Sequence, residues 1–192
     1  MAGNSHGESP RQKMINLMYL VLLAMLALNV SSDVLQGFSL VDESLNRSTA
    51  NATMQNQTIY QSFADYMAKN PEKAGEWNER AQYVKRISDS LYTLAEELKW
   101  RIVRASDGDD ADMNNIENKE DLEAATTVML NPIDGKGSLL REAINGYREE
   151  ILKMVTDTIQ RRIISDNLST EVPQSGILLG KNWQEYMFEN TP

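Results

Sequence analysis

Four polar side chains lie in or beside a long apolar stretch near the N-terminus: Arg11, Lys13, Asn16 and Tyr19. A guanidinium stays protonated at any relevant pH and pairs with carboxylates, while a carboxamide or a phenol exchanges hydrogen bonds with them. These residue types therefore suit recognition of an acidic group on a partner. An alternative places Arg11 and Lys13 at phospholipid head groups and Tyr19 in an interfacial aromatic belt.

The segment that positions these side chains has the length and composition of one membrane-spanning helix. Its apolar run, Met14–Val30, has 17 residues, which is about 26 Å of helix against a hydrocarbon core of about 30 Å. Polar groups are costly in lipid and usually face protein. We therefore predict a transmembrane helix over residues 10–32 that also contacts a partner.

Charge predicts the orientation of this helix. Residues 1–30 carry a net charge of +1 and the remaining residues carry −10. Because basic residues flank the cytoplasmic end of a span, residues 1–9 are predicted to be a cytoplasmic arm and the bulk of the chain periplasmic. A cleaved signal peptide is the competing interpretation, since an apolar core, Leu17–Leu28, follows the basic residues. Asn29 interrupts the approach to any cleavage site and argues against it.

Composition argues against several other classes of protein. The chain has no cysteine, its one histidine is His6 in the polar arm, and its net charge of −9 disfavours nucleic acid as a partner. We find no catalytic constellation, so we expect no enzyme, no cofactor and no metal. The acidic loop Ser106–Asn118 fails the calcium pattern, because counting from Asp107 position 6 is Asp112 and position 12 is Asn118. A solvated loop is expected there.

The rest of the chain is predicted to be all-α. The first helix should continue from the span to residue 69, and Asn70-Pro71 should begin a second long helix. A short helix at about 119–130 and a third long helix from Ser138 to about Ile163 complete an antiparallel bundle over residues 33–170. Residues 171–192 are expected to be an extended tail that leads to further domains.

Directly after the span, four apolar residues follow a heptad spacing: Val34, Phe38, Val41 and Leu45. A seam that begins so close to the membrane favours pairing of two identical chains. Packing of these residues within the chain's own bundle is the alternative.

The block PRQKMINLMYLVLLAMLALNVSSDVL (Pro10–Leu35) resembles the N-terminus of the gliding-motility protein M family, GldM/PorM, of the type IX secretion system. The segment Asn182–Phe188 is compatible with the family's first periplasmic domain. The resemblance implies a homodimer in the bacterial inner membrane, surrounded by a ring of the membrane protein GldL/PorL. It also implies distal domains, absent here, that reach further periplasmic and outer-membrane secretion components.

For the site, the resemblance implies that Arg11 and Tyr19 lie near a membrane glutamate of the partner; Asn16 and Lys13 are added on physical grounds alone. The implied function is conversion of the proton-motive force into rotation that powers secretion and gliding. The span contains no Asp or Glu, so the partner must supply any titrating carboxylate. A periplasmic helical sensor and a passive scaffold are the alternative functions.

Overall fold

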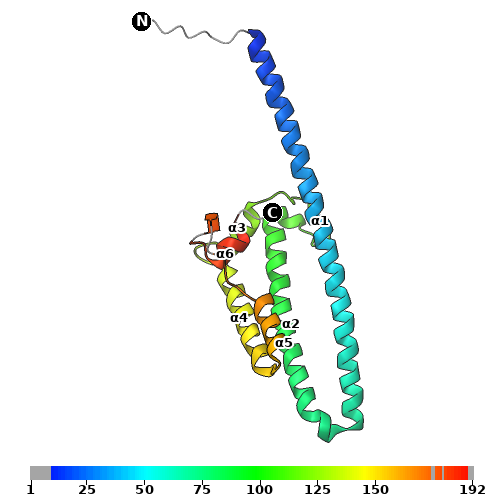
Figure 1. Ribbon diagram of the computed structural model, residues 1–192. Helices are drawn as coiled ribbons and strands as arrows, with labels where there is room; N and C mark the ends of the chain where they lie inside the picture. Colours follow the sequence, from blue (N-terminus) through cyan, green and yellow to red (C-terminus); the bar gives the residue numbers. More distant parts are fainter. Residues whose placement is uncertain (1–9, 174–175, 179, 190–192) are drawn as a thin grey trace. The chain divides into compact units, whose positions relative to one another are not determined.

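The structure is a computed structural model in which every described element is a helix, a turn or a loop (Figure 1). The all-α prediction is confirmed for this part of the chain. The described residues are 10–173, 176–178 and 180–189, with only the backbone described over 26–33 and at 177. The predicted cytoplasmic arm, residues 1–9, and the side chain of Asn29 therefore lie outside the described residues.

Helix α1 is a single element of 60 residues, Pro10–Lys69. This confirms the prediction that the first helix continues without a break from the apolar N-terminal segment. The chain divides into two compact units, one ending at Asn56 and the other beginning at Gln57, so the boundary falls inside α1. None of the helices, as far as the structure describes them, has an apolar stretch long enough to cross a membrane.

Helix α2, Pro71–Asp107, begins where the sequence predicts. Proline suits the first turn because the N–H that it lacks would have no partner inside the helix. The side chain of Asn70 makes no capping hydrogen bond, so the proline alone marks this boundary. The helix ends at Gly108, whose φ of +72° is a conformation that side chains with a Cβ rarely adopt.

Helix α3, Glu123–Met129, is shorter than the predicted 119–130. The Asp121 carboxylate accepts hydrogen bonds from the backbone N–H groups of Glu123 and Ala124 at 2.8 and 3.2 Å. The Asp121 side chain thus accepts hydrogen bonds from the first N–H groups of α3. The helix begins two residues after Asp121, at Glu123. Ala124, Ala125 and Met129 are all buried in the core of the second unit, where α3 packs on α2.

The third long helix predicted from Ser138 to Ile163 is wrong, because the chain forms two helices, α4 (Gly137–Met154) and α5 (Thr158–Asn167). Asp157 caps α5 by accepting a hydrogen bond from the N–H of Gln160 at 2.8 Å. The Arg161 guanidinium donates to the carbonyl oxygens of Leu152 and Val155. The carbonyls freed at the end of α4 are thus satisfied by a side chain of α5.

Helices α2 and α4 lie side by side and run in opposite directions (Figure 1). Ser88 and Tyr147 share a hydrogen bond of 2.9 Å between their hydroxyl oxygens, and Tyr83 donates to Glu150 at 2.9 Å. From the first contact to the second, the residue number falls along α2 and rises along α4. The two helices are therefore antiparallel.

The acidic segment after α2 is a closed loop that opens with the short 3-10 helix η1, Gly108–Asp110. The Asp107 carboxylate accepts hydrogen bonds from the backbone N–H groups of Glu117 and Asn118, both at 2.9 Å. Ser106 and Asn118 exchange two further hydrogen bonds at 3.1 Å. These backbone hydrogen bonds hold the pKa of Asp107 below its usual value.

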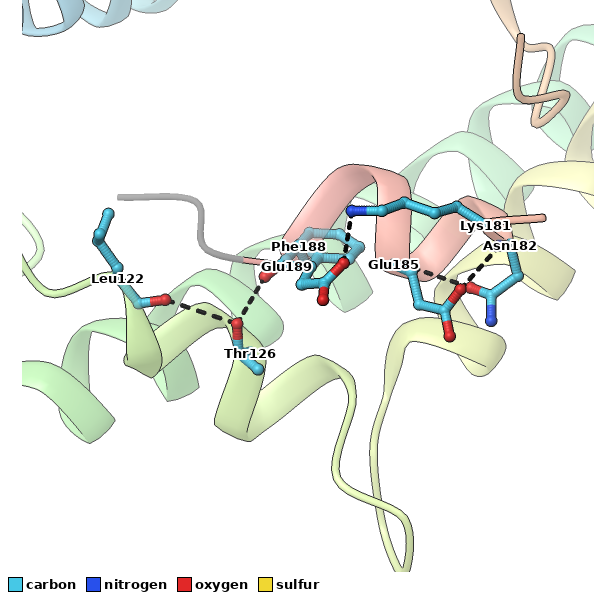
Figure 2. A network of polar contacts seen from close by, with 7 residues as sticks. All are labelled: Leu122, Thr126, Lys181, Asn182, Glu185, Phe188 and Glu189. Atoms are coloured by element: carbon cyan, nitrogen blue, oxygen red, sulfur yellow. Dashed lines mark hydrogen bonds and ion pairs between the residues drawn. The ribbon is translucent and has the colours of Figure 1, made fainter. Parts of the chain in front are cut away.

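The predicted extended tail is corrected by two helical segments, η2 (Gly176–Leu178) and α6 (Trp183–Phe188). Figure 2 shows the capping box that starts α6. Asn182 accepts from the N–H of Glu185, and the Glu185 carboxylate accepts from the N–H of Asn182, both at 2.9 Å. A Lys181–Glu189 ion pair of 2.5 Å spans the helix.

Packing explains why so short a helix forms. Trp183 is 7% exposed, and its ring meets that of Phe188 edge to face with 5.8 Å between the centroids. Thr126 of α3 donates to the Phe188 carbonyl oxygen at 2.9 Å (Figure 2). Gly137 opens α4 without a Cβ, which would lie 2.8 Å from Cγ of Gln184. Helix α6 therefore docks on both α3 and α4.

Trp183→Ala should destabilise the second unit by about 3–5 kcal/mol, because it empties a buried aromatic site. Trp77 is 60% exposed, so Trp77→Ala is the matched control and should cost less than about 1 kcal/mol. Urea unfolding of both variants, followed by circular dichroism, measures the difference. Equal losses of stability would contradict the docking of α6.

Asp107→Asn should weaken the loop closure most at neutral pH. A folded-state pKa below the unfolded value means that the carboxylate stabilises the fold above the unfolded pKa and loses that effect as the pH falls through the folded pKa. The difference in free energy of unfolding between the native protein and the variant should therefore become smaller as the pH falls below about 4. The exposed Asp109→Asn is the control. A pH-independent gap would contradict the proposed role of the carboxylate.

Candidate functional site

The sequence-predicted site residues near the N-terminus all lie on the first turns of α1. Every residue from 10 to 25 is exposed, and Tyr19 keeps 62% of its surface accessible. Apolar neighbours, among them Ile15, Met18 and Leu22, line an open hollow along the helix beside Tyr19. This surface is available to contact a partner or lipid.

Helical geometry separates the four predicted residues around the axis. At 100° per residue, Arg11 and Tyr19 lie about 80° apart and about 12 Å apart along the axis. Asn16 lies about 60° beyond Tyr19, and Lys13 faces away from Arg11. Arg11 and Tyr19 can therefore address one partner at two depths, whereas Lys13 points to a different neighbour.

Gln12 is a site residue that the sequence reasoning did not single out. Its side-chain amide donates to Oδ1 of Asn16 at 3.1 Å, one turn further along α1. The i, i+4 spacing of two carboxamides was the available signal. The contact links the Asn16 carboxamide to that of Gln12 on the surface of α1.

The predicted dimer seam forms one exposed stripe on α1. Val34, Phe38, Val41 and Leu45 fall within about 60° of each other around the axis, and their exposed fractions run from 50% to 61%. An apolar stripe of this kind normally faces another helix. Packing of the seam on the chain's own bundle is not tested by these residues alone.

A second polar cluster, between α2 and α4, was also not anticipated. The Lys153 ammonium donates to Glu150 at 2.5 Å, and Tyr83 donates to the other carboxylate oxygen. Lys153 and Tyr83 together lower the pKa of Glu150, while Glu150 raises the pKa values of both partners. The charges are paired, so the cluster fixes the helix register. Polar residues in the apolar stripes, such as Ser88, were the only sequence signal.

Within the described residues, no three His, Cys, Asp or Glu side chains lie close enough together to hold a metal ion. The Asp107 carboxylate, the first of the acidic loop, is already engaged by backbone N–H groups.

Comparison with known proteins identifies the family from a part of the chain that hardly overlaps the N-terminal block. No curated protein matches the chain. Residues 33–192 match the family described as the GldM N-terminal domain, whereas the block that suggested the resemblance, Pro10–Leu35, lies almost wholly before that range. Since the match covers most of the sequence, the chain belongs to the GldM family, which is tied to gliding motility and type IX secretion.

Proposed function

We propose that this chain is an inner-membrane motor subunit that draws on the proton-motive force through a multi-span partner of the GldL/PorL kind. The observation that carries the proposal is the exposure of Arg11 and Tyr19 on a helix that continues without a break to Lys69. The Arg11 guanidinium and the Tyr19 phenol near the start of α1 are thus connected through one continuous helix to the folded second unit.

The positive charge of Arg11 couples protonation of the partner carboxylates to rotation of α1. A guanidinium near a partner carboxylate favours the ionised carboxylate and depresses its pKa, whereas a carboxylate left in lipid takes up a proton. If α1 rotates inside a ring of such carboxylates, each one alternates between the two states. The energy available is about 2.3 kcal/mol per proton for each 100 mV, so each step is small and must be repeated.

Tyr19 extends the contact deeper into the membrane. It lies about 12 Å further along the axis than Arg11, within the apolar run. Its hydroxyl can donate to a carboxylate or accept from a protonated one, so it can serve both states. The Gln12–Asn16 hydrogen bond places a further carboxamide beside it. Lys13 lies on the other side of the helix and is the weakest candidate for this contact.

The proposed topology places α1 across the membrane once, with the N-terminus in the cytoplasm. Arg11 and Lys13 precede the apolar run and satisfy the positive-inside rule. The acidic remainder, including the compact second unit, then lies in the periplasm. Domains that follow this chain would carry the motion toward the outer membrane.

Two copies of the chain are proposed to pair along the seam Val34, Phe38, Val41 and Leu45. These four side chains are at least half exposed in the single chain and share one face. Pairing would remove that apolar surface from water, at about 25 cal/mol for each Å². A paired rod also resists twisting better than one helix, which suits transmission of torque.

Arg11→Gln should reduce gliding and secretion by more than about tenfold while the membrane complex still assembles, because a buried carboxylate loses its counter-charge. Lys13→Gln is the matched control and should retain most of both activities. Gliding speed, secreted protein and co-purification of the partner are the measurements. Normal motility of Arg11→Gln would sink the coupling proposal.

Single cysteines test the seam cleanly, because the chain contains none. Val41→Cys should form a disulfide-linked dimer in membranes, since a disulfide requires Cα atoms within about 7 Å. Glu43→Cys projects about 160° away around the helix and is the control. Non-reducing electrophoresis reads out the product. Equal cross-linking at both positions, or none at Val41, would contradict the seam.

A further inference from the structure

Helix α1 changes character between its middle and its C-terminal end. Every residue from 36 to 59 is exposed, whereas Tyr60, Phe63 and Met67 are each partly buried. These three residues have helical spacing and belong to the second compact unit. The last turns of α1 therefore carry partly buried side chains, whereas the side chains of the turns just before them are exposed.

The stretch 46–58, called here the polar segment, has a composition that disfavours helix. Seven of its residues are Asn, Thr or Ser. Thr loses side-chain freedom in a helix, while Asn and Ser offer the backbone competing hydrogen bonds. An isolated helix of such residues is marginal in water, and helices in proteins usually rely on packing of an apolar face. The apolar seam before the polar segment ends at Leu45.

Several contacts along α1 lie at the two ends of the polar segment, among them a hydrogen bond of 2.9 Å from the Ser62 hydroxyl to the Thr58 carbonyl oxygen. At its beginning, Arg47 pairs with Glu43 at 2.5 Å and Asn46 donates to Asp42 at 3.0 Å. Beyond its end, Gln61 donates to Asp65 at 3.0 Å. Exposed pairs of this kind stabilise a helix weakly. The boundary between the two compact units, Asn56 to Gln57, also falls inside the polar segment.

Tyr60 is the first residue after the polar segment whose side chain is partly buried. Burial raises the pKa of Tyr60, the charge of Lys85 acts against this rise, and Asp89 and Tyr147 add to it. Lys85 and Asp89 are themselves paired at 2.5 Å. The side chain of Tyr60 is therefore partly buried within the second unit.

We propose that the polar segment is a compliant joint: its helix opens locally and reversibly, so that α1 can bend and twist between Leu45 and Ile59 while the turns that carry the partly buried Tyr60, Phe63 and Met67 stay helical. Local opening of this kind requires few buried contacts and exposed backbone hydrogen bonds, and the polar segment has both. The joint goes beyond the proposed motor function and does not require it. In a motor it would act as a torsionally soft coupling that smooths stepwise rotation.

Hydrogen exchange with mass spectrometry on the full chain, in membranes or detergent, tests the joint directly. The amides of residues 46–58 should exchange at least about tenfold faster than those of residues 60–67 and of the middle of α2. Equal protection in the three regions would overturn the proposal. So would protection of the polar segment that rises with protein concentration, because a second copy would then cover it.

A stiffened variant supplies the second arm. Ala at Asn51, Thr53 and Asn56 together should slow exchange in the polar segment by about tenfold, because each replacement favours helix roughly two- to threefold. Ser90→Ala, at an exposed position of the packed helix α2, is the control and should change protection little. Unchanged exchange in the triple variant would also overturn the joint. Arg11→Gln should leave the pattern intact, which separates failure of the joint from failure of the motor.

Discussion

The continuity of α1 from Pro10 to Lys69, interrupted at most by local and reversible opening, is the constraint on which the motor proposal depends. Sixty residues of continuous helix extend for about 90 Å, so a rotation at Arg11 has a covalent and hydrogen-bonded route to Lys69. No other element of the described chain begins at the N-terminal site. If the helix were permanently broken, the exposed cation and phenol would be disconnected from the unit that is proposed to carry the load.

The second unit is held together by packing among α2, α3, α4 and α6. The last turns of α1 contribute Tyr60, Phe63 and Met67, and α2 runs antiparallel to α4 with hydroxyl and carboxylate contacts that fix the register. The docking of α6 on α3 and α4 ties the C-terminal part of the chain to the same core.

Much of this fold could be predicted from the sequence where one local rule decides the outcome. Pro71 fixes the start of α2 because its missing N–H is tolerated only in the first turn. The break between α4 and α5 could not be predicted from periodicity, since apolar residues continue across Val155. It depends on the Asp157 cap and on Arg161 reaching back to two carbonyl groups. Helix α6 was missed because its six residues are helical chiefly through docking.

For the candidate site, the sequence could predict only which side chains take part and which chemical group they would bind. Arg11 and Tyr19 predict a partner with an acidic group, because burying their side chains in lipid without such a partner costs free energy. The partner's position is not encoded in this chain, and the exposed N-terminal turns of α1 hold no counterpart for them. Family membership is established over residues 33–192, a range that does not include Arg11 or Tyr19.

Imaging of the purified membrane complex is the most direct test of the central claim. The account predicts two α1 helices inside a ring of partner helices, with the Arg11 guanidinium within about 4 Å of a partner carboxylate and the Tyr19 hydroxyl facing the same ring. Arg11 and Tyr19 surrounded by phospholipid, with no protein neighbour, would contradict it.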